Sequence, residues 1–342
     1  MANIREVARQ AGVSVATVSR VLNHPESVSP STMKQVLETM KRLDYTPNVF
    51  ARSLALNRSS SIGLIVPNIL NPLYPQVAKG VEDIARQKGY NILLCNTEED
   101  QEKERGYLNM LLEKRAGGLV LTSSRLEESD IERIRKSGVP FVMVGRNMEE
   151  VDANMVFTDY QMGGYQITQH LIEIGHRRIA HITGNPHHRE SLEKRLGYEK
   201  ALREAGIPIL DHYLVEGNNE MESGYLGAKK LLKMEERPHA IFAGNDLMAI
   251  GAMEAIKDSG LSIPEDIGVV GFDDINIATL IQPRLTTISQ PVYKMGLIAA
   301  RLLFENIENK EENDFCQKIF IQPKLMVRKS CGHEDRVREI FN

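Results

Sequence analysis

The sequence predicts an α/β protein that begins with a small all-α domain. Three observations support this fold class. The first 47 residues contain three short stretches with helical spacing of apolar residues, residues 61 to 330 alternate apolar runs with amphipathic stretches, and the chain has 342 residues. A body of about 280 residues is too long for one hydrophobic core, so we expect two doubly wound lobes with parallel sheets.

The first helix of the head is expected to begin after Asn3. Asn3 can cap the helix, and Glu6 can reach back three residues to complete a capping box. One face of this helix carries the apolar residues Ile4, Val7, Ala8 and Ala11. Gly12 then suits a left-handed cap, which ends the helix and turns the chain.

A second helix is expected after Ser14, which can cap it, and a third begins at Ser29 with Pro30 in its first position. The residues expected to pack between the helices are Val18, Val21, Leu22, Met33, Val36, Leu37, Met40 and Leu43. Two short helices joined by a glycine-containing turn match the helix-turn-helix unit, whose second helix enters the major groove of DNA.

The charge distribution favours a DNA-binding head over a plain three-helix bundle. Residues 1–60 contain eight Lys and Arg against four Asp and Glu, a formal charge of +4. The remaining residues contain 34 basic against 42 acidic side chains, a charge of −8. A basic head on an acidic body is typical of a segment that meets phosphates.

The body shows the alternation of strands and helices that is typical of parallel sheets. The expected strands are Ile62–Val66, Asn91–Cys95, Gly118–Leu121, Phe141–Val144, Ile179–Thr183, Leu214–Glu216, Ala240–Ala243 and Ile267–Gly271. The expected helices are Leu73–Lys88, Glu102–Lys114, Ser129–Ser137, Met162–Ile174, Lys194–Ala205, Glu222–Leu232 and Asp246–Asp258.

Polar residues follow many of these strands, where ligands bind in folds of this kind. They are Asn68, Asn71, Tyr74, Arg146, His187, His188, Glu190, Asn219, Asn245 and Asp273. Each residue alone is more often a cap or a turn residue, but together they indicate a ligand pocket at one edge.

Several other classes of protein are disfavoured by the sequence. Cys95, Cys316 and Cys331 are too few and too scattered for a disulfide framework or a zinc site. We expect no metal at His181, His187 and His188, because no Cys or carboxylate spacing accompanies them. We expect no cofactor and no enzyme, because no phosphate-binding loop, nucleophile elbow or nucleophile–base constellation occurs. Without a signal peptide or a long apolar run, we expect a cytoplasmic protein that does not enter a membrane.

The chain resembles the LacI/GalR family of bacterial transcriptional regulators, nearest to its purine repressor and catabolite control protein branches. The resemblance is carried in order by Val13–Asn23, Tyr45–Asn48, Ala51–Leu54, Ser61–Leu64, Gly175–Arg177, Asn245–Asp246, Gly271–Asp274 and Thr286–Pro291. It covers nearly the whole chain, and the head motif is highly specific.

The resemblance implies four segments: a helix-turn-helix DNA-binding domain over 1–47, a hinge helix and linker over 48–60, a core over 61–330 and a short tail over 331–342. The core is expected to resemble a periplasmic binding protein, with an effector between its two lobes. The stretch 291–328 is expected to return to the first lobe. No leucine heptad follows Arg328, so a homodimer on a palindromic operator is expected rather than a tetramer.

For the DNA contact, the resemblance assigns base reading to Val15, Ala16 and Arg20. Arg20 can donate two hydrogen bonds to one guanine, while Val15 and Ala16 offer only apolar contact. Further DNA-binding residues implied by the family are Thr17, Ser19, Asn23, Ala51 and Leu54. Leu54 matches the leucine that wedges between bases in the minor groove; without the family it would be interpreted as a packing residue.

For the effector, the resemblance implies binding by Asn68, Tyr74, Arg146, Lys194, Asn219, Asn245, Asp273 and Gln290. Lys194 stands where the family has an arginine, and a lysine cannot form the planar double contact of a guanidinium. Leu73 and Asn219 replace aromatic residues of the purine repressor. We therefore expect a sugar or a sugar phosphate rather than a purine.

We expect a dimeric, sequence-specific DNA-binding regulator that acts as a repressor under control of an effector in the cleft. Two alternatives stay open at this point. One is control by a protein partner that docks on the first lobe, and the other is a solute-binding protein without output to DNA.

Overall fold

The computed structural model describes residues 3–23, 27–45, 59–145, 151–186, 188–308 and 316–332. The chain divides into two compact units, the head over Met1–Ser59 and the body over Ser60–Asn342.

The head contains the three predicted helices, α1 (Ile4–Gln10), α2 (Val15–Asn23) and α3 (Pro30–Arg42). Asn3 caps α1, because its Oδ1 accepts a hydrogen bond of 3.0 Å from the backbone N–H of Glu6. The predicted capping box is not complete, since the Glu6 carboxylate accepts from Arg9 and Gln10 instead. Gly12 adopts the predicted left-handed conformation, with φ +61°.

A small apolar core joins the three helices of the head. Its buried members are Val7, Ala8, Ala11, Val18, Val21, Val36 and Met40. Leu37 was expected in this core but is 47 % exposed. It occupies the position next to Val36, and on a helix consecutive side chains point about 100° apart, so only one of the two can face the core.

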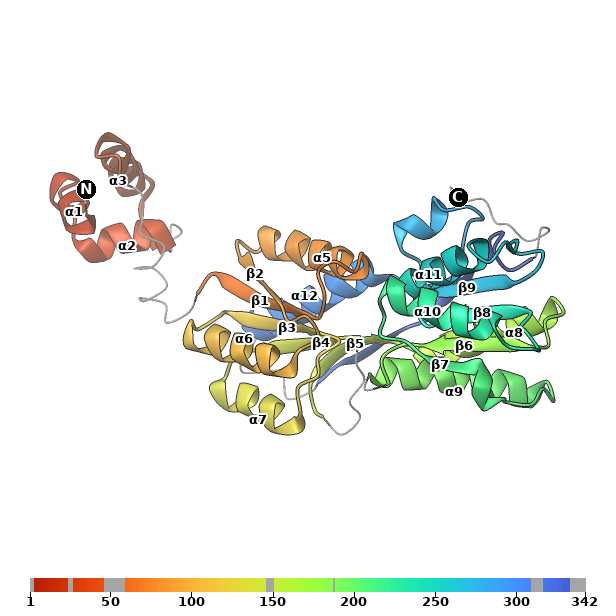
Figure 1. The fold of residues 1–342 in the computed structure, drawn as a ribbon. Helices are drawn as coiled ribbons and strands as arrows, with labels where there is room; N and C mark the ends of the chain where they lie inside the picture. The colour runs from red at the N-terminus through yellow and green to blue at the C-terminus, as the bar shows by residue number, and fades with distance from the viewer. Residues whose placement is uncertain are drawn as a thin grey trace. The chain divides into compact units, whose positions relative to one another are not determined.

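The first lobe is a six-stranded sheet with helices on both faces (Figure 1). In spatial order its strands are β11 (Lys318–Ile321), β5 (Asn154–Thr158), β4 (Phe141–Val144), β3 (Gly118–Thr122), β1 (Ser61–Val66) and β2 (Asn91–Asn96). One face is covered by α5 (Leu73–Gln87) and α12 (Val292–Glu308). The other face is covered by α6 (Gln101–Glu113) and α7 (Glu128–Ser137).

The second lobe repeats this strand order. Its strands are β12 (Lys324–Met326), β10 (Thr286–Ser289), β9 (Gly268–Asp273), β8 (Ala240–Ala243), β6 (Ile179–Thr183) and β7 (Leu214–Glu216). The helices α10 (Met221–Leu232) and α11 (Asp246–Lys257) cover one face, and α8 (Tyr160–Glu173) and α9 (Arg189–Glu204) cover the other. Two short 3-10 helices, Asp211–Tyr213 and Asn276–Thr279, complete the lobe.

The chain passes between the lobes after β5, after β10 and after β11. Every neighbouring pair among the described strands is parallel except β10 and β12. The stretch 291–328 was expected to return to the first lobe, which is correct for α12 and β11. It is wrong for β12, because that strand pairs antiparallel with β10 at the edge of the second sheet. None of the helices in the described part of the chain is both long and apolar enough to span a membrane.

Paired helices approach one another through glycine, and α8 against α9 is the clearest case. A Cβ atom on Gly164 of α8 would collide with the backbone carbonyl of Lys194 in α9. Conversely, a Cβ atom on Gly197 would collide with the backbone carbonyl of Gln161. The same reciprocal approach joins Gly80 of α5 to α12, the helix that returns from the second lobe. At these contacts the two helix backbones lie so close that only glycine, which lacks a Cβ atom, fits between them.

We predict that Gly164→Ala will lower the free energy of unfolding by about 1–3 kcal/mol, because the added methyl group forces α8 and α9 apart. Urea denaturation checks this. Gly106→Ala in α6 is the matched control, since no atom lies within 4 Å of the new methyl group, and it should be neutral or stabilising by about 0.5–1 kcal/mol. Equal behaviour of the two variants would show that the α8–α9 approach is not tight.

Candidate functional site

The exposed side of α2 forms the first candidate site. Val18 and Val21 face the core of the head, whereas Val15, Ala16 and Arg20 are exposed. Val15 is 42 % exposed although it is a valine at the start of a helix. Because 3.6 residues make one turn, residues 15, 16, 19 and 20 lie within about 140° of helix circumference and form one face.

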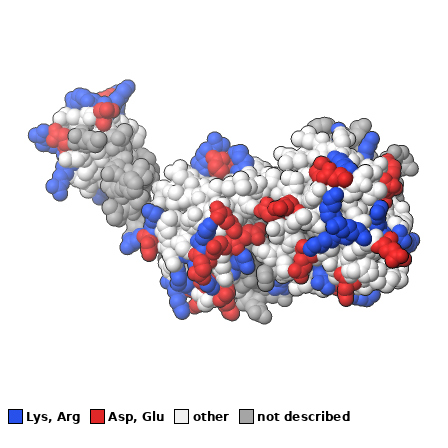
Figure 2. Space-filling view, in the orientation of Figure 1, with Lys and Arg blue, Asp and Glu red and all other residues white. Residues whose placement is uncertain are grey.

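Most of the predicted DNA-binding residues belong to this exposed face of α2. Ser19 lies within this face and Thr17 at its margin, and both are partly exposed. The Thr17 hydroxyl lies 2.9 Å from that of Ser14, the residue that caps α2. The side chain of Asn23 and both Ala51 and Leu54 lie outside the described residues. Figure 2 shows Lys and Arg at several separate points of the head rather than in one patch. The candidate DNA-binding surface is therefore identified by the exposed face of α2 and not by a basic patch.

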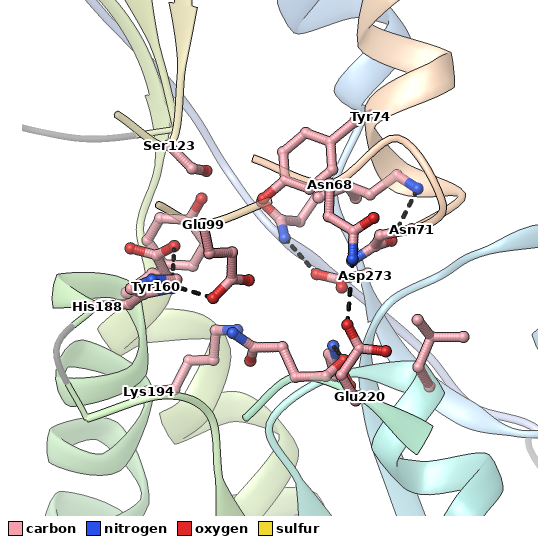
Figure 3. Close-up of a pocket in the computed structure, with 16 residues that line it drawn as sticks. Asn68, Asn71, Tyr74, Glu99, Ser123, Tyr160, His188, Lys194, Glu220 and Asp273 are labelled. Atoms are coloured by element: carbon pink, nitrogen blue, oxygen red, sulfur yellow. Dashed lines mark hydrogen bonds and ion pairs between the residues drawn. The ribbon is translucent and has the colours of Figure 1, made fainter. Parts of the chain in front are cut away.

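A cleft between the two lobes of the body forms the second candidate site (Figure 3). Its cavity volume in this structure is about 40 Å³, so the two lobes lie close together around it. Its lining comes from loops after strands and from the first turns of helices: Asn68, Asn71, Leu73, Tyr74, Glu99, Ser123, Tyr160, His188, Glu190, Lys194, Asn219, Glu220, Asn245, Leu247, Asp273 and Gln290.

The structure brings together seven of the eight residues that the sequence selected for the effector: Asn68, Tyr74, Lys194, Asn219, Asn245, Asp273 and Gln290. Arg146 and His187 lie outside the described residues. Sequence reasoning missed Glu99, Ser123, Tyr160 and Glu220. Glu99 and Ser123 follow predicted strands and could have been found by the same rule, whereas Tyr160 follows β5, a strand that the sequence analysis did not include.

Lys194 is a buried cation whose ammonium group is already engaged. Its side chain is 5 % exposed, and its Nζ donates a hydrogen bond of 2.7 Å to the backbone oxygen of Gly244. The same Nζ lies 4.5 Å from the centre of the Phe272 ring, a cation–π contact. Lys194 therefore stands at the floor of the cleft with its charge held by a carbonyl and a ring.

Asp273 ends β9 on the opposite side of this floor. Its Oδ1 accepts a hydrogen bond of 2.7 Å from Gln290 Nε2, and its backbone adopts φ +114°. Burial raises the pKa of Asp273 to about 6, although the positive charge of Lys194 and the bond from Gln290 oppose that rise. A carboxyl group with such a pKa is a strong acceptor that lacks a full charge partner.

The loop that carries Asp273 is held by charged groups below it. Asp246 accepts from the Thr287 hydroxyl at 2.6 Å and from the backbone N–H of Ile275 at 2.8 Å. The neighbouring Asp274 accepts from the buried Arg328 at 2.6 Å. These bonds fix the position of Asp273 from both sides of the loop.

Two tyrosines supply aromatic surface to the cleft, Tyr74 from the first lobe and Tyr160 from the second. Burial raises the pKa of both hydroxyl groups, and the negative charge of Glu190 is the next cause in each case. Both tyrosines therefore remain neutral and can donate a hydrogen bond to a ligand.

Polar contacts across the cleft join the two lobes. Asn68 Nδ2 of the first lobe donates to Glu220 Oε1 of the second at 3.1 Å. Glu99 Oε2 of the first lobe lies 3.5 Å from His188 Nε2, and Glu190 Oε1 lies 3.7 Å from His188 Nδ1. The contact between His188 and Glu190 lies within the second lobe, so a change in the angle between the lobes would change only the first two distances.

Comparison with known proteins adds to this geometry. The family model described as "Bacterial regulatory proteins, lacI family" matches residues 3–48, and the model "Periplasmic binding proteins and sugar binding domain of LacI family" matches residues 59–329. Catabolite control protein A of Priestia megaterium is 41 % identical over 312 residues, 91 % of this chain and 94 % of that protein. The PurR repressor of Photobacterium profundum is 37 % identical over 332 residues, 96 % of this chain and 98 % of that protein.

Solved structures agree with these relatives. The lac repressor dimer bound to operator and the anti-inducer ONPF has a TM-score of 0.84 at 28 % identity, covering 96 % of this chain and 99 % of that one. The complex of the transcriptional regulator CelR with cellobiose has a TM-score of 0.73 at 31 % identity, covering 96 % and 100 %. The predicted helix-turn-helix head and two-lobed core are confirmed by these matches.

We predict that Asp273→Asn will stabilise the unliganded protein at neutral pH and much less in acid. A raised carboxyl pKa means that folding favours the protonated form, so stability present below about pH 4 is lost as the pH rises through about 6. The stabilising effect of the substitution should grow by about 2 kcal/mol between about pH 4.5 and about pH 7.5.

Calorimetric unfolding at the two pH values measures this difference. Asp211→Asn, at an exposed aspartate, controls for the loss of one charge. A stabilisation by Asp273→Asn that is the same at both pH values would show that this carboxyl group titrates as it does in the unfolded chain.

Proposed function

The chain belongs to the LacI family of bacterial regulatory proteins, and we propose that it is a dimeric repressor whose binding to a palindromic operator is controlled by a small molecule in the interlobe cleft. It is a DNA-binding transcriptional regulator, as its relatives are. The observation that carries the proposal is the cleft itself, because its polar lining comes from both lobes. A molecule bound there must contact both lobes and so fixes their angle.

The DNA-binding half of the proposal rests on the exposed face of α2. Val15, Ala16 and Arg20 present apolar and guanidinium groups away from the head core, as base-reading residues must. We assign Thr17, Ser19 and Asn23 to the margin of the same contact. Ala51 and Leu54 are assigned to the minor groove from the family resemblance.

Two copies are needed for a palindromic operator, and the first lobe offers a surface for pairing. Strand β2 is the last strand of this sheet among the described residues, and it exposes Leu93 and Leu94. Exposed apolar edge strands are usually covered by a partner. We propose that a second copy of the chain covers β2, as expected for a regulator that places two heads on one operator.

For the effector, we propose a sugar or a sugar phosphate rather than a purine, bound by Asn68, Tyr74, Lys194, Asn219, Asn245, Asp273 and Gln290, with Arg146 assigned from the sequence alone. Carboxylate and amide groups dominate this set, and they suit the hydroxyl groups of a sugar. The relatives are regulators and not enzymes, and we propose no catalytic activity. We propose a cytoplasmic location, because the proposed partner is operator DNA.

We predict that Arg20→Ala will reduce operator affinity by about 1–3 kcal/mol for each half-site, because the bidentate contact to guanine is lost. The operator is first selected from random duplexes with the unaltered protein. Titration of operator and unrelated DNA at two salt concentrations should then show residual binding that is weak, salt-dependent and similar for both.

Arg9→Ala is the matched control for charge, since Arg9 lies on α1 and pairs with Glu6. It should weaken binding to both kinds of DNA by a similar small factor. If Arg20→Ala and Arg9→Ala discriminate operator from unrelated DNA equally well, α2 does not read bases through Arg20.

The effector is tested by a thermal-shift screen of the full chain against sugars, sugar phosphates and nucleobases. A ligand at 100 times its Kd should add about 2.7 kcal/mol of stability, and Asp273→Asn should reduce that gain. A screen without any stabilising compound would contradict small-molecule control and favour a protein partner on the first lobe.

A further inference from the structure

The charges that line the cleft are strongly unequal. Four carboxylates line it, from Glu99, Glu190, Glu220 and Asp273, whereas among the described lining residues Lys194 is the one permanent cation. Figure 3 shows Glu99, Glu220 and Asp273 around one space, with Glu99 near His188 and Glu220 near Asp273. Carboxylates gathered in one cleft repel one another unless a cation lies among them.

Lys194 does not supply that cation for the whole cleft. Its Nζ is bonded to the backbone oxygen of Gly244 and lies over the Phe272 ring. Its charge opposes the rise in the pKa of Asp273, but burial still dominates and Glu190 adds to the rise. The negative charge near Glu190 and Glu99 is therefore left without a fixed ammonium or guanidinium group among the described lining residues.

His188 makes a second, independent demand for a donor. The residue is only 7 % exposed, and its Nε2 has no hydrogen-bond partner among the described residues. The nearest opposing atom is Glu99 Oε2 at 3.5 Å, which can only accept, while Nδ1 faces Glu190 at 3.7 Å. A neutral imidazole donates from one nitrogen only, so one of these two approaches brings two acceptors together.

A donor from a ligand resolves that mismatch, and so does protonation of His188. Among the described lining residues, four carboxylates then face the ammonium group of Lys194 and at most one imidazolium. Either way the described lining carries more carboxylates than cations, and Arg146, assigned to the effector from the sequence alone, lies outside the described residues. A phosphate ester would add further negative charge to that excess, whereas an ammonium group would reduce it.

The aromatic lining lies where a cation would be held. Burial first, and then Glu190, Asp273 and Glu99 as neighbouring charges, raise the pKa of Tyr74. Tyr74 and these three carboxylates line the same cleft, and Tyr160 lines it from the second lobe. A ring face beside carboxylates is a favourable environment for a ligand ammonium group.

We propose that the cleft binds a polyhydroxylated ligand that carries a protonated amine, an amino sugar, with its ammonium group among Glu99, Glu190 and Asp273, and that it disfavours phosphate esters. The inference rests on the proposed function, because it names the ligand class of the same cleft. Amide side chains of Asn68, Asn245 and Gln290 then meet the hydroxyl groups.

The test is isothermal titration calorimetry of the full chain with matched probes, at about pH 6.5, where an aliphatic amine is protonated. The probes are glucose, glucosamine and glucose 6-phosphate, with the corresponding sets for galactose and mannose. In at least one set the amine should bind about tenfold more tightly than its parent sugar, as expected for a charge-assisted bond in place of a neutral one. The phosphate should bind more weakly than the parent.

Glu190→Gln should bring the ratio between amine and parent close to one, because it removes one of the carboxylate charges. Glu204→Gln removes the same charge at the far end of α9, on an exposed side chain, and should keep the tenfold ratio. Asp273→Asn provides a second variant should Glu190→Gln not fold.

Equal affinity for amine and parent, tighter binding of a phosphate, or no binding of any of the nine probes would each overturn the amino-sugar inference. The broader thermal-shift screen separates that result from failure of the proposed function. A neutral sugar, sugar phosphate or nucleobase found there keeps small-molecule control and removes only the amine.

Discussion

The close approach of α9 to α8 is the constraint on which the cleft depends. The backbone of α9 at Lys194 lies directly against Gly164, so the helix can slide or rotate only by colliding with α8. The same helix carries His188 just before its first residue and Glu190 in its first turn. One backbone contact therefore fixes the cation at the floor of the cleft together with two groups at its wall. A methyl group at the contact would shift all three at once, since packed interiors transmit displacement rather than absorb it.

The connections between the lobes allow the second lobe, which carries α9, to change its angle relative to the first. Three chain segments cross between the lobes, and α12, on its return, packs against α5 at Gly80. The polar contacts described across the cleft are few: Asn68 with Glu220, and Glu99 with His188. Contacts of this kind contribute about 1 kcal/mol each or less where exposed. A ligand that replaces them can shift the lobe angle by a coupling of about 1–3 kcal/mol, the size usual for regulation between sites.

The sequence was sufficient for elements that repeat a strong pattern and insufficient for those that do not. The eight predicted strands all occur, and the predicted helices of the body are present, with Lys194–Ala205 the one that began late, because Arg189 to Glu193 is too polar to show a helical face. The strands β5, β10, β11 and β12 and the helix α12 were not among the predicted elements. Of these, β11 and β12 are edge strands of four and three residues that each begin with an exposed lysine. The site followed the same division. Residues directly after predicted strands were found, whereas Tyr160 depended on β5 and Glu220 on the start of α10, where only the fold shows which residues face the other lobe.

Backbone strain gathers where the ligand would bind, and this distribution links stability to function. Eight non-glycine residues of the described chain have positive φ, and four of them line the cleft: Glu99, Ser123, Asn219 and Asp273. Such conformations cost about 1–3 kcal/mol each and persist only where the surrounding structure enforces them. The unliganded cleft also holds the buried cation of Lys194 and the unsatisfied Nε2 of His188. The body therefore concentrates its unfavourable conformations and charges in one place, and there a ligand that supplies donors to the carboxylates can offset them. Such a ligand must contact both lobes to offset these unfavourable terms. Its binding therefore stabilises the cleft and changes the angle between the lobes at the same time.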